Sequence, residues 1–234
     1  MPTQHALLSA SGAHRWLHCT GSPLLEKDFP DSTSVYAQEG TLAHELCELK
    51  LVAYTGEITK RKLTSMKNKL MKSELWQPEM DSTSETYLDY IKDITMSYTV
   101  KPVILTEKRV DFSRYVPEGF GTADCLVLAG DTLHVVDYKH GKGVVVDADH
   151  NPQMMLYALG AMSELSLLYR FKFVHMTIVQ PRVNNISEFT MTADELIEWG
   201  ETIVKPKAEA AMSGNGEFEA GDWCRFCRAK QQCK

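Results

Sequence analysis

The sequence predicts a single α/β domain whose central elements follow the order helix, three strands, helix, strand. Two observations predict this class. Apolar residues recur at helical spacing in the first part of the chain, whereas residues 103–180 contain short runs rich in β-branched side chains between turn residues. The chain has 234 residues, 44% hydrophobic and 24% charged, which is an ordinary globular mixture with enough length to bury a core. We expect a mixed central sheet flanked by helices, a helical insertion and a cysteine-rich C-terminal tail.

Charge and hydropathy restrict the partners of this protein. Lys and Arg number 25 and Asp and Glu 31, a formal net charge of −6, so a contact with nucleic acid would depend on a local basic patch. No apolar run approaches the ~18 residues of a membrane span. The first residues lack the basic and then apolar pattern of a secretory signal. We therefore expect a cytoplasmic protein that does not associate with a membrane.

The first hundred residues are expected to be mainly helical. Residues 1–34 form an irregular or short-helical lead-in, and residues 57–100 are polar and compatible with helix. Between them, a helix is expected over residues 41–54, which Gly56 can end. Its apolar residues follow one stripe at steps of three and four: Leu42, Leu46, Leu49 and Ala53.

Residues 60–72 form a basic segment with six Lys or Arg and no acidic residue. Two interpretations stay open for it. It is either the solvated face of a helix or a patch that contacts the DNA backbone. In the second case, removing its charges should weaken DNA binding and flatten its salt dependence.

Strand signals begin at Val103. We expect strands at residues 103–112, 121–129 and 132–139, the last two joined by the two-residue turn Gly130-Asp131. A further strand is expected at residues 171–180.

Two more helices complete the expected order. Asn151 as N-cap and Pro152 at the first helical position open one that continues to about Tyr169. Another is expected from Thr192 to about Met212, with Pro206 as a point where it can kink. Glycines at positions 214 and 216 end it before the tail.

The expected hairpin contains the residues that are best suited to bind a metal ion or to catalyse a reaction. If Gly130-Asp131 is a two-residue turn, the register that pairs Ala129 with Thr132 places Asp124 directly opposite Asp137. Lys139 lies two residues further and shares their face, whereas Tyr138 points to the other side. Like charges directly across a hairpin repel each other, and a divalent cation such as Mg²⁺ would offset that repulsion. The alternative is an exposed sheet face with an Asp/Lys salt bridge.

These residues resemble a known family. GTAD, ending at Asp124, and DYK, residues 137–139, resemble motifs II and III of the PD-(D/E)XK nucleases, whose restriction-endonuclease-like core has the same α-β-β-β-α-β order. EGTLAH, residues 39–44, resembles the motif-I histidine of the RecB-like exonuclease branch, and Gln153-Met-Met-Leu-Tyr157 fits its QxxxY motif. GFGTAD, VVDYKHGKG and NPQMMLYALGA together also resemble an uncharacterised phage- and prophage-associated branch. The resemblance covers about residues 39–180.

The resemblance implies a role for each matching residue. Asp124 and Asp137 would bind Mg²⁺ or Mn²⁺, with His44 and the backbone carbonyl of Tyr138 as further ligands. Lys139 would be the catalytic lysine. The pair Gln153 and Tyr157, four residues apart on one helix face, would position the substrate. Taken alone, His44 could be an ordinary histidine, and Gln153 and Tyr157 a capping residue and a core aromatic. Glu107, on the preceding strand, could add a carboxylate.

The cysteine tail indicates a second metal centre. Cys224, Cys227 and Cys233 supply three thiolates, and four complete a zinc site or an iron–sulfur cluster. Their spacing resembles the C-terminal iron–sulfur signature of some RecB-like nucleases, which implies a 4Fe–4S cluster with Cys19 as the upstream fourth ligand. Zinc, or free or oxidised thiols after purification in air, are the alternatives. The two remaining cysteines are read as small buried hydrophobic residues: Cys47 and Cys125.

The sequence thus predicts one nuclease domain over residues 1–234. It has a lead-in (1–38), a core (39–180) with the basic helical insertion (57–100), and a C-terminal helix with the cysteine tail (181–234). The expected activity is metal-dependent hydrolysis of linear DNA from its ends, in phage or prophage DNA replication, recombination or repair, with proteins of those processes as partners. The alternatives are a nuclease-fold module that binds DNA or a partner without cutting, and a redox protein. The sequence indicates neither the polarity of cleavage, nor the strand preference, nor the oligomeric state.

Overall fold

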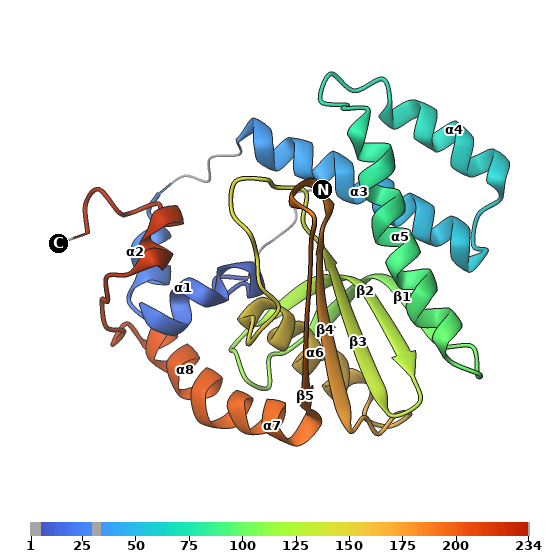
Figure 1. Cartoon of the computed structure of the whole chain (residues 1–234). Helices are drawn as coiled ribbons and strands as arrows, with labels where there is room; N and C mark the ends of the chain where they lie inside the picture. Colours follow the sequence, from blue (N-terminus) through green and yellow to red (C-terminus); the bar gives the residue numbers. More distant parts are fainter. Residues whose placement is uncertain (1–5, 30–33, 234) are drawn as a thin grey trace.

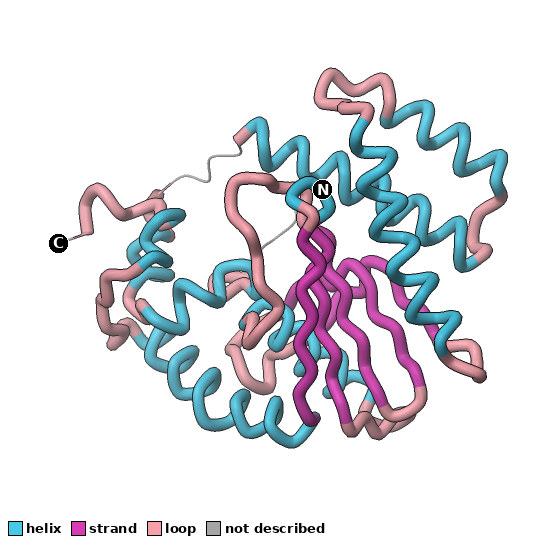
Figure 2. The backbone as a smooth tube through the Cα atoms, viewed as in Figure 1, coloured by secondary structure: helices cyan, strands magenta, loops and turns pink. Residues whose placement is uncertain are grey.

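The computed structural model describes residues 6–29 and 34–233, and its centre is a five-stranded mixed sheet with helices on both faces (Figures 1 and 2). The strands are β1 (Val103–Asp111), β2 (Phe120–Ala129), β3 (Thr132–Tyr138), β4 (Phe173–Gln180) and β5 (Asn185–Thr192). The helices are α1 (Ala13–His18), α2 (Ser22–Glu26), α3 (Val35–Thr55), α4 (Lys60–Leu70), α5 (Glu79–Ser97), α6 (Pro152–Leu165), α7 (Ala193–Trp199) and α8 (Lys205–Ser213). Short turns of helix are η1 (Ala10–Gly12), η2 (Pro181–Val183), the π-helical η3 (Gly200–Val204) and η4 (Asp222–Phe226). The expected α/β class is confirmed.

The sheet order is β1-β2-β3-β4-β5, and only β3 and β4 pair in parallel. The chain between β3 and β4 passes through α6, because two parallel strands need a crossover connection. The β2–β3 hairpin has the predicted register, since Ala129 pairs with Thr132 and Cys125 with Val136. This register brings the ends of β2 and β3 that carry the acidic residues to one end of the sheet.

Two apolar clusters hold the layers together. On one face, Leu126, Leu133 and Val135 pack with residues of α6, α1 and α8. On the other, Cys125, Val136 and Tyr138 pack with α3 and α5. Helix α4 has no buried residue and lies outside this layer, against α3. The central strands β2, β3 and β4 are therefore buried on both sides, and α4 is an exposed addition.

Several element boundaries differ from the sequence-based expectation. Helix α3 begins at Val35, because the side chain of Ser34 accepts a hydrogen bond from the N–H of Ala37 and caps it. Helix α6 ends at Leu165 rather than near residue 169. The last helix is two helices joined by the π-helical turn η3, immediately before Pro206, so the irregularity precedes the proline.

Strand β5 was not expected. It is an edge strand antiparallel to β4, with Thr192 opposite Phe173 at one end and Asn185 opposite Gln180 at the other. Along most of the strand, half-buried residues alternate with exposed ones. Within the described residues, no helix is both long and apolar enough to cross a bilayer.

Candidate active site

Four residues singled out in the sequence meet where β2 begins and β3 ends. Asp124 and Asp137 continue the alternation of the residues that face α6, so their carboxylates share that face of the hairpin. The backbone ladder stops at Cys125–Val136. Beyond this pair, the N–H of Tyr138 donates to a side chain in place of a backbone carbonyl of β2: its acceptor is Asp124 Oδ2, at 2.8 Å.

His44 approaches this end of the sheet from the middle of α3. Its Nδ1 lies 3.3 Å from Asp124 Oδ2. Its ring packs edge-on against the ring of Tyr138, with centroids 5.3 Å apart. A histidine on the first long helix and an aspartate on β2 are thereby brought into direct contact.

Lys139, Asp137 and Gln153 form the other half of the site. Lys139 Nζ lies 2.9 Å from Asp137 Oδ2 and donates to Gln153 Oε1 at 3.0 Å. The Gln153 amide donates to Asp137 Oδ1 at 3.4 Å and to Tyr157 Oη at 3.1 Å. Gln153 lies in the first turn of α6, behind the Asn151 cap, and Tyr157 one turn later. The QxxxY pair therefore holds the catalytic-lysine candidate and its aspartate together.

The electrostatics of the site follow from burial and proximity. Burial alone would raise the pKa of Asp124, but the charge and hydrogen bond of His44 lower it. Burial alone would lower the pKa of His44, but Asp124 raises it to about 9. Burial, with the Asp124 charge, raises the pKa of Asp137, and Lys139 remains protonated because the two aspartates raise its pKa against burial. Protonated His44 and Lys139 thus balance the charge of the two aspartates.

Glu107 also belongs to the site. Thr106 pairs with Cys125 and Lys108 with Ala123, so Glu107 lies opposite Asp124, where the ladder is interrupted. Its φ is 47°, a left-handed conformation that a non-glycine residue adopts at a cost of about 1–3 kcal/mol. One ligand atom each from His44, Glu107 and Asp124 lie within 4.8 Å of one another. Partial desolvation by nearby protein atoms and the charge of Asp124 raise the pKa of Glu107 to about 7, although its side chain is exposed.

A buried polar network supports the site from behind. Tyr138 Oη donates to Thr83 Oγ1 at 2.9 Å and lies 3.0 Å from His140 Nδ1. His140 Nε2 lies 3.0 Å from Glu39 Oε1, which also accepts from Arg182 Nη1 at 2.8 Å. Sequence reasoning gave no supporting role to Glu39, His140 or Arg182, although Glu39 is the first residue of the EGTLAH motif and His140 directly follows DYK. The network ties the start of α3 to the strand end that carries Lys139.

The cysteines separate into two groups. Cys19, Cys224, Cys227 and Cys233 all line one cavity of about 260 Å³ beside Trp223. Cys47 and Cys125 are buried in the core, and burial raises the pKa of both thiols.

Hydrogen bonds join the lead-in to the tail around this cavity. The N–H of Glu217 donates to Thr20 Oγ1 at 2.8 Å, and the N–H of Gly21 donates to the Glu217 carbonyl at 2.9 Å. Glu26 holds Arg15 through Oε2 at 2.9 Å and accepts from the N–H of Arg228 through Oε1 at 2.7 Å. The lead-in and the tail thus meet around the cavity that the four cysteines line.

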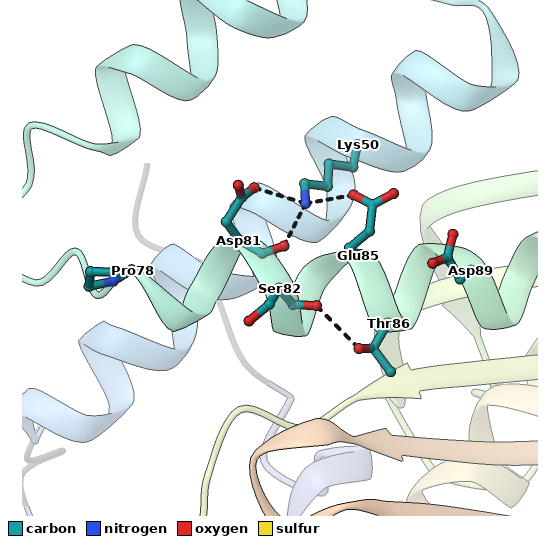
Figure 3. A pocket seen from close by; sticks show the side chains of 7 residues that line it. All are labelled: Lys50, Pro78, Asp81, Ser82, Glu85, Thr86 and Asp89. Atoms are coloured by element: carbon teal, nitrogen blue, oxygen red, sulfur yellow. Dashed lines mark hydrogen bonds and ion pairs between the residues drawn. The ribbon is translucent and has the colours of Figure 1, made fainter.

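The basic segment lies on the exposed helix α4 and is partly engaged by the protein itself. Lys67 Nζ lies 2.7 Å from Asp81 Oδ1 of α5. Beside this contact, an open hollow of about 560 Å³ on α5 contains Lys50, which Asp81 and Glu85 hold between them (Figure 3). With Asp89 at its rim the hollow is predominantly acidic, so it is unsuited to a phosphate.

A family model described as "Protein of unknown function (DUF2800)" matches residues 5–234. The solved structure titled "Crystal structure of SSO0001" is similar at 13% sequence identity and a TM-score of 0.37, over 82% of this chain and 84% of that one. That likeness is too distant to inform the site.

Proposed function

We propose that this chain, which belongs to the DUF2800 family of proteins of unknown function, is a metal-dependent deoxyribonuclease of the PD-(D/E)XK type. The observation that carries the proposal is the convergence of His44, Asp124, Asp137 and Lys139 at one end of the β2–β3 hairpin. The resemblance to RecB-like exonucleases favours linear DNA as substrate and a place in phage or prophage DNA replication, recombination or repair.

The donor set suits Mg²⁺ or Mn²⁺. Carboxylate oxygens are the ligands that Mg²⁺ prefers, and Mn²⁺ also accepts an imidazole nitrogen. Asp124, Asp137 and His44 would hold the cation, with the Tyr138 carbonyl as a further ligand. Glu107 lies close enough to His44 and Asp124 to join them. A bound divalent cation would polarise the scissile phosphate and the attacking water.

The protein's own residues supply the remaining parts of the reaction. Lys139 is protonated and can donate to the nucleophile or to charge that develops on the phosphate. Gln153 accepts from Lys139 and donates to Asp137, so it fixes both side chains relative to each other. Tyr157 accepts from the Gln153 amide and holds that amide in its orientation. The site thus offers one proton donor and one cation position side by side.

We further propose that Cys19, Cys224, Cys227 and Cys233 hold a 4Fe–4S cluster. Four thiols that line one cavity match the four thiolates such a cluster needs. Its role would be structural, because it would fasten the lead-in to the tail where hydrogen bonds already join them. Zinc in place of iron would preserve the four-cysteine grouping and change only the metal.

The activity is tested with end-labelled linear duplex DNA and closed circular DNA, each incubated with anaerobically purified protein with and without Mg²⁺ or Mn²⁺. We expect degradation of the linear DNA only, and only with a divalent cation. Cleavage of closed circles would replace the exonuclease proposal with an endonuclease. Binding of DNA without cleavage under any of these conditions would identify a silent DNA-binding module instead.

A further inference from the structure

The segment Gly141–Val145, here called the tip loop, follows β3 on the way to α6 (Figure 1). All five of its residues are exposed, including Val145 at 65%. It begins two residues after Lys139, and a chain of three residues spans at most about 10 Å, so Lys142 stays close to the catalytic-lysine candidate. The tip loop therefore borders the proposed active site.

A buried glutamine holds the tip loop in shape. Gln180 is 1% exposed, and its amide donates to the carbonyls of Gly141 at 2.6 Å and Val144 at 2.8 Å. Its Oε1 accepts from the N–H of Val146 at 3.1 Å. At the other end, the side chain of His140 is fixed by Tyr138 and Glu39. The loop is thus anchored on both sides, although its surface is open to solvent.

The free hydrogen-bonding groups of the tip loop are mostly donors. Gln180 takes up two of its carbonyls, whereas none of the backbone N–H groups of residues 141–145 donates to an acceptor in the described part of the chain. Lys142 likewise has no carboxylate within ion-pair distance among the described residues. Free N–H groups beside a lysine favour an anionic oxygen as ligand.

The two glycines are not required by the fold. Neither Gly141 nor Gly143 has a left-handed φ, and a Cβ at either would meet no atom within 4 Å. Gly130, in contrast, has a φ of 59° that its turn requires. A glycine without a conformational or packing reason leaves the backbone open to the close approach of a ligand.

We propose that the tip loop binds the phosphodiester backbone of the DNA strand beside the scissile phosphate, through its free N–H groups and Lys142. The inference rests on the proposed nuclease function and adds the element that holds the strand. Phosphate oxygens would approach the backbone at Gly141 and Gly143, and Lys142 would neutralise one phosphate. The acidic hollow on α5 cannot serve this purpose, so the strand would run along the tip loop rather than across α5.

The test is the affinity for a fluorescein-labelled 20-base-pair duplex, measured by anisotropy over a range of salt concentrations. Ca²⁺ replaces Mg²⁺ so that the DNA stays intact. The variants are Gly141→Ala, Gly143→Ala and Lys142→Gln, and Lys101→Gln is the control, an exposed lysine at the other end of the sheet. We expect each alanine to weaken binding by about tenfold, because its methyl group would keep a phosphate oxygen from the close approach that the glycine backbone allows. Lys142→Gln should reduce the slope of log K against log salt by about 0.9, because one phosphate is no longer neutralised.

The possible outcomes separate the two proposals. If the wild-type protein binds and cuts DNA but the three loop variants bind within twofold of it, the tip loop proposal is overturned and the nuclease stands. If the wild-type protein neither binds nor cuts DNA, both fall. Lys142 is exposed, so a smaller slope in Lys142→Gln with an unchanged melting temperature cannot be ascribed to misfolding. Equal slopes for Lys142→Gln and Lys101→Gln would contradict the charge contact.

Discussion

The affinity of the proposed active site for a cation should depend on pH through His44. The histidine Nδ1 lies 3.3 Å from Asp124, which raises the pKa of the imidazole to about 9. A metal ion binds only the neutral imidazole, so a cation must displace the proton wherever the pH is below that pKa. Raising the pH from 6 to 8 should therefore strengthen Mn²⁺ binding about a hundredfold, or about 2.7 kcal/mol, at about 1.4 kcal/mol for each tenfold change. The gain should level off as the pH passes about 9.

Isothermal titration calorimetry measures this directly. Mn²⁺ is titrated into the protein at pH 7.5 in two buffers that differ in ionisation enthalpy, and the difference in heat gives the protons released. We expect close to one proton per cation, because His44 is almost fully protonated at that pH. In His44→Gln the proton release should fall to the part that Glu107 contributes, and the affinity should rise at most about tenfold between pH 6 and 8, because the pKa of Glu107 is about 7. A wild-type affinity that is independent of pH, with no proton release, would refute the assignment of His44 as a ligand.

Three further predictions concern the cysteines, Glu107 and the basic helix. Anaerobically prepared protein should be brown, with about four iron and four sulfide per chain. Absorption spectra should show that Cys19→Ser abolishes the colour and that Cys47→Ala retains it. Colour in both variants would contradict the grouping of Cys19 with the tail cysteines. Glu107→Gly should relieve the strain of the left-handed φ and raise the free energy of unfolding by about 1 kcal/mol. The same variant should bind Mn²⁺ more weakly in isothermal titration calorimetry. An unchanged affinity would exclude Glu107 from the cation site. Charge removal on α4 should reduce the salt slope of DNA binding by about 0.9 for each phosphate that is no longer neutralised, and an unchanged slope would make the segment a solvated face. The residues to replace by Gln are those not held by Asp81: Lys60, Arg61, Lys62, Lys69 and Lys72.

The hairpin was predictable because its register is set locally. A two-residue turn at Gly130-Asp131 leaves one pairing for the two strands, and from it the positions of Asp124 and Asp137 follow. The face of each side chain then follows from the alternation along a strand. Local rules of this kind are enough to locate the acidic pair from the sequence.

Features that depend on distant parts of the chain were not predictable in this way. Strand β5 is polar and half-exposed, and it exists because β4 offers it a pairing edge. Glu107 was expected from the sequence only as a possible further carboxylate, because no residue pattern indicates the left-handed φ with which it interrupts the β1–β2 ladder. The partner of Lys67 is Asp81, on a different helix. In each case tertiary contacts decide the outcome.

The central claim is that the β2–β3 hairpin end is the active site of a nuclease. It is tested most directly by the single-turnover rate at which linear duplex DNA is hydrolysed in Mg²⁺ by wild-type protein, Asp137→Asn and Lys139→Met, with Lys101→Met as control. We predict that the two site variants lose at least about a hundredfold in rate, in line with the loss of one preorganised charge-stabilising group, while they melt close to the wild-type temperature and the control cleaves normally. Cleavage by Asp137→Asn or Lys139→Met at the wild-type rate would contradict the account.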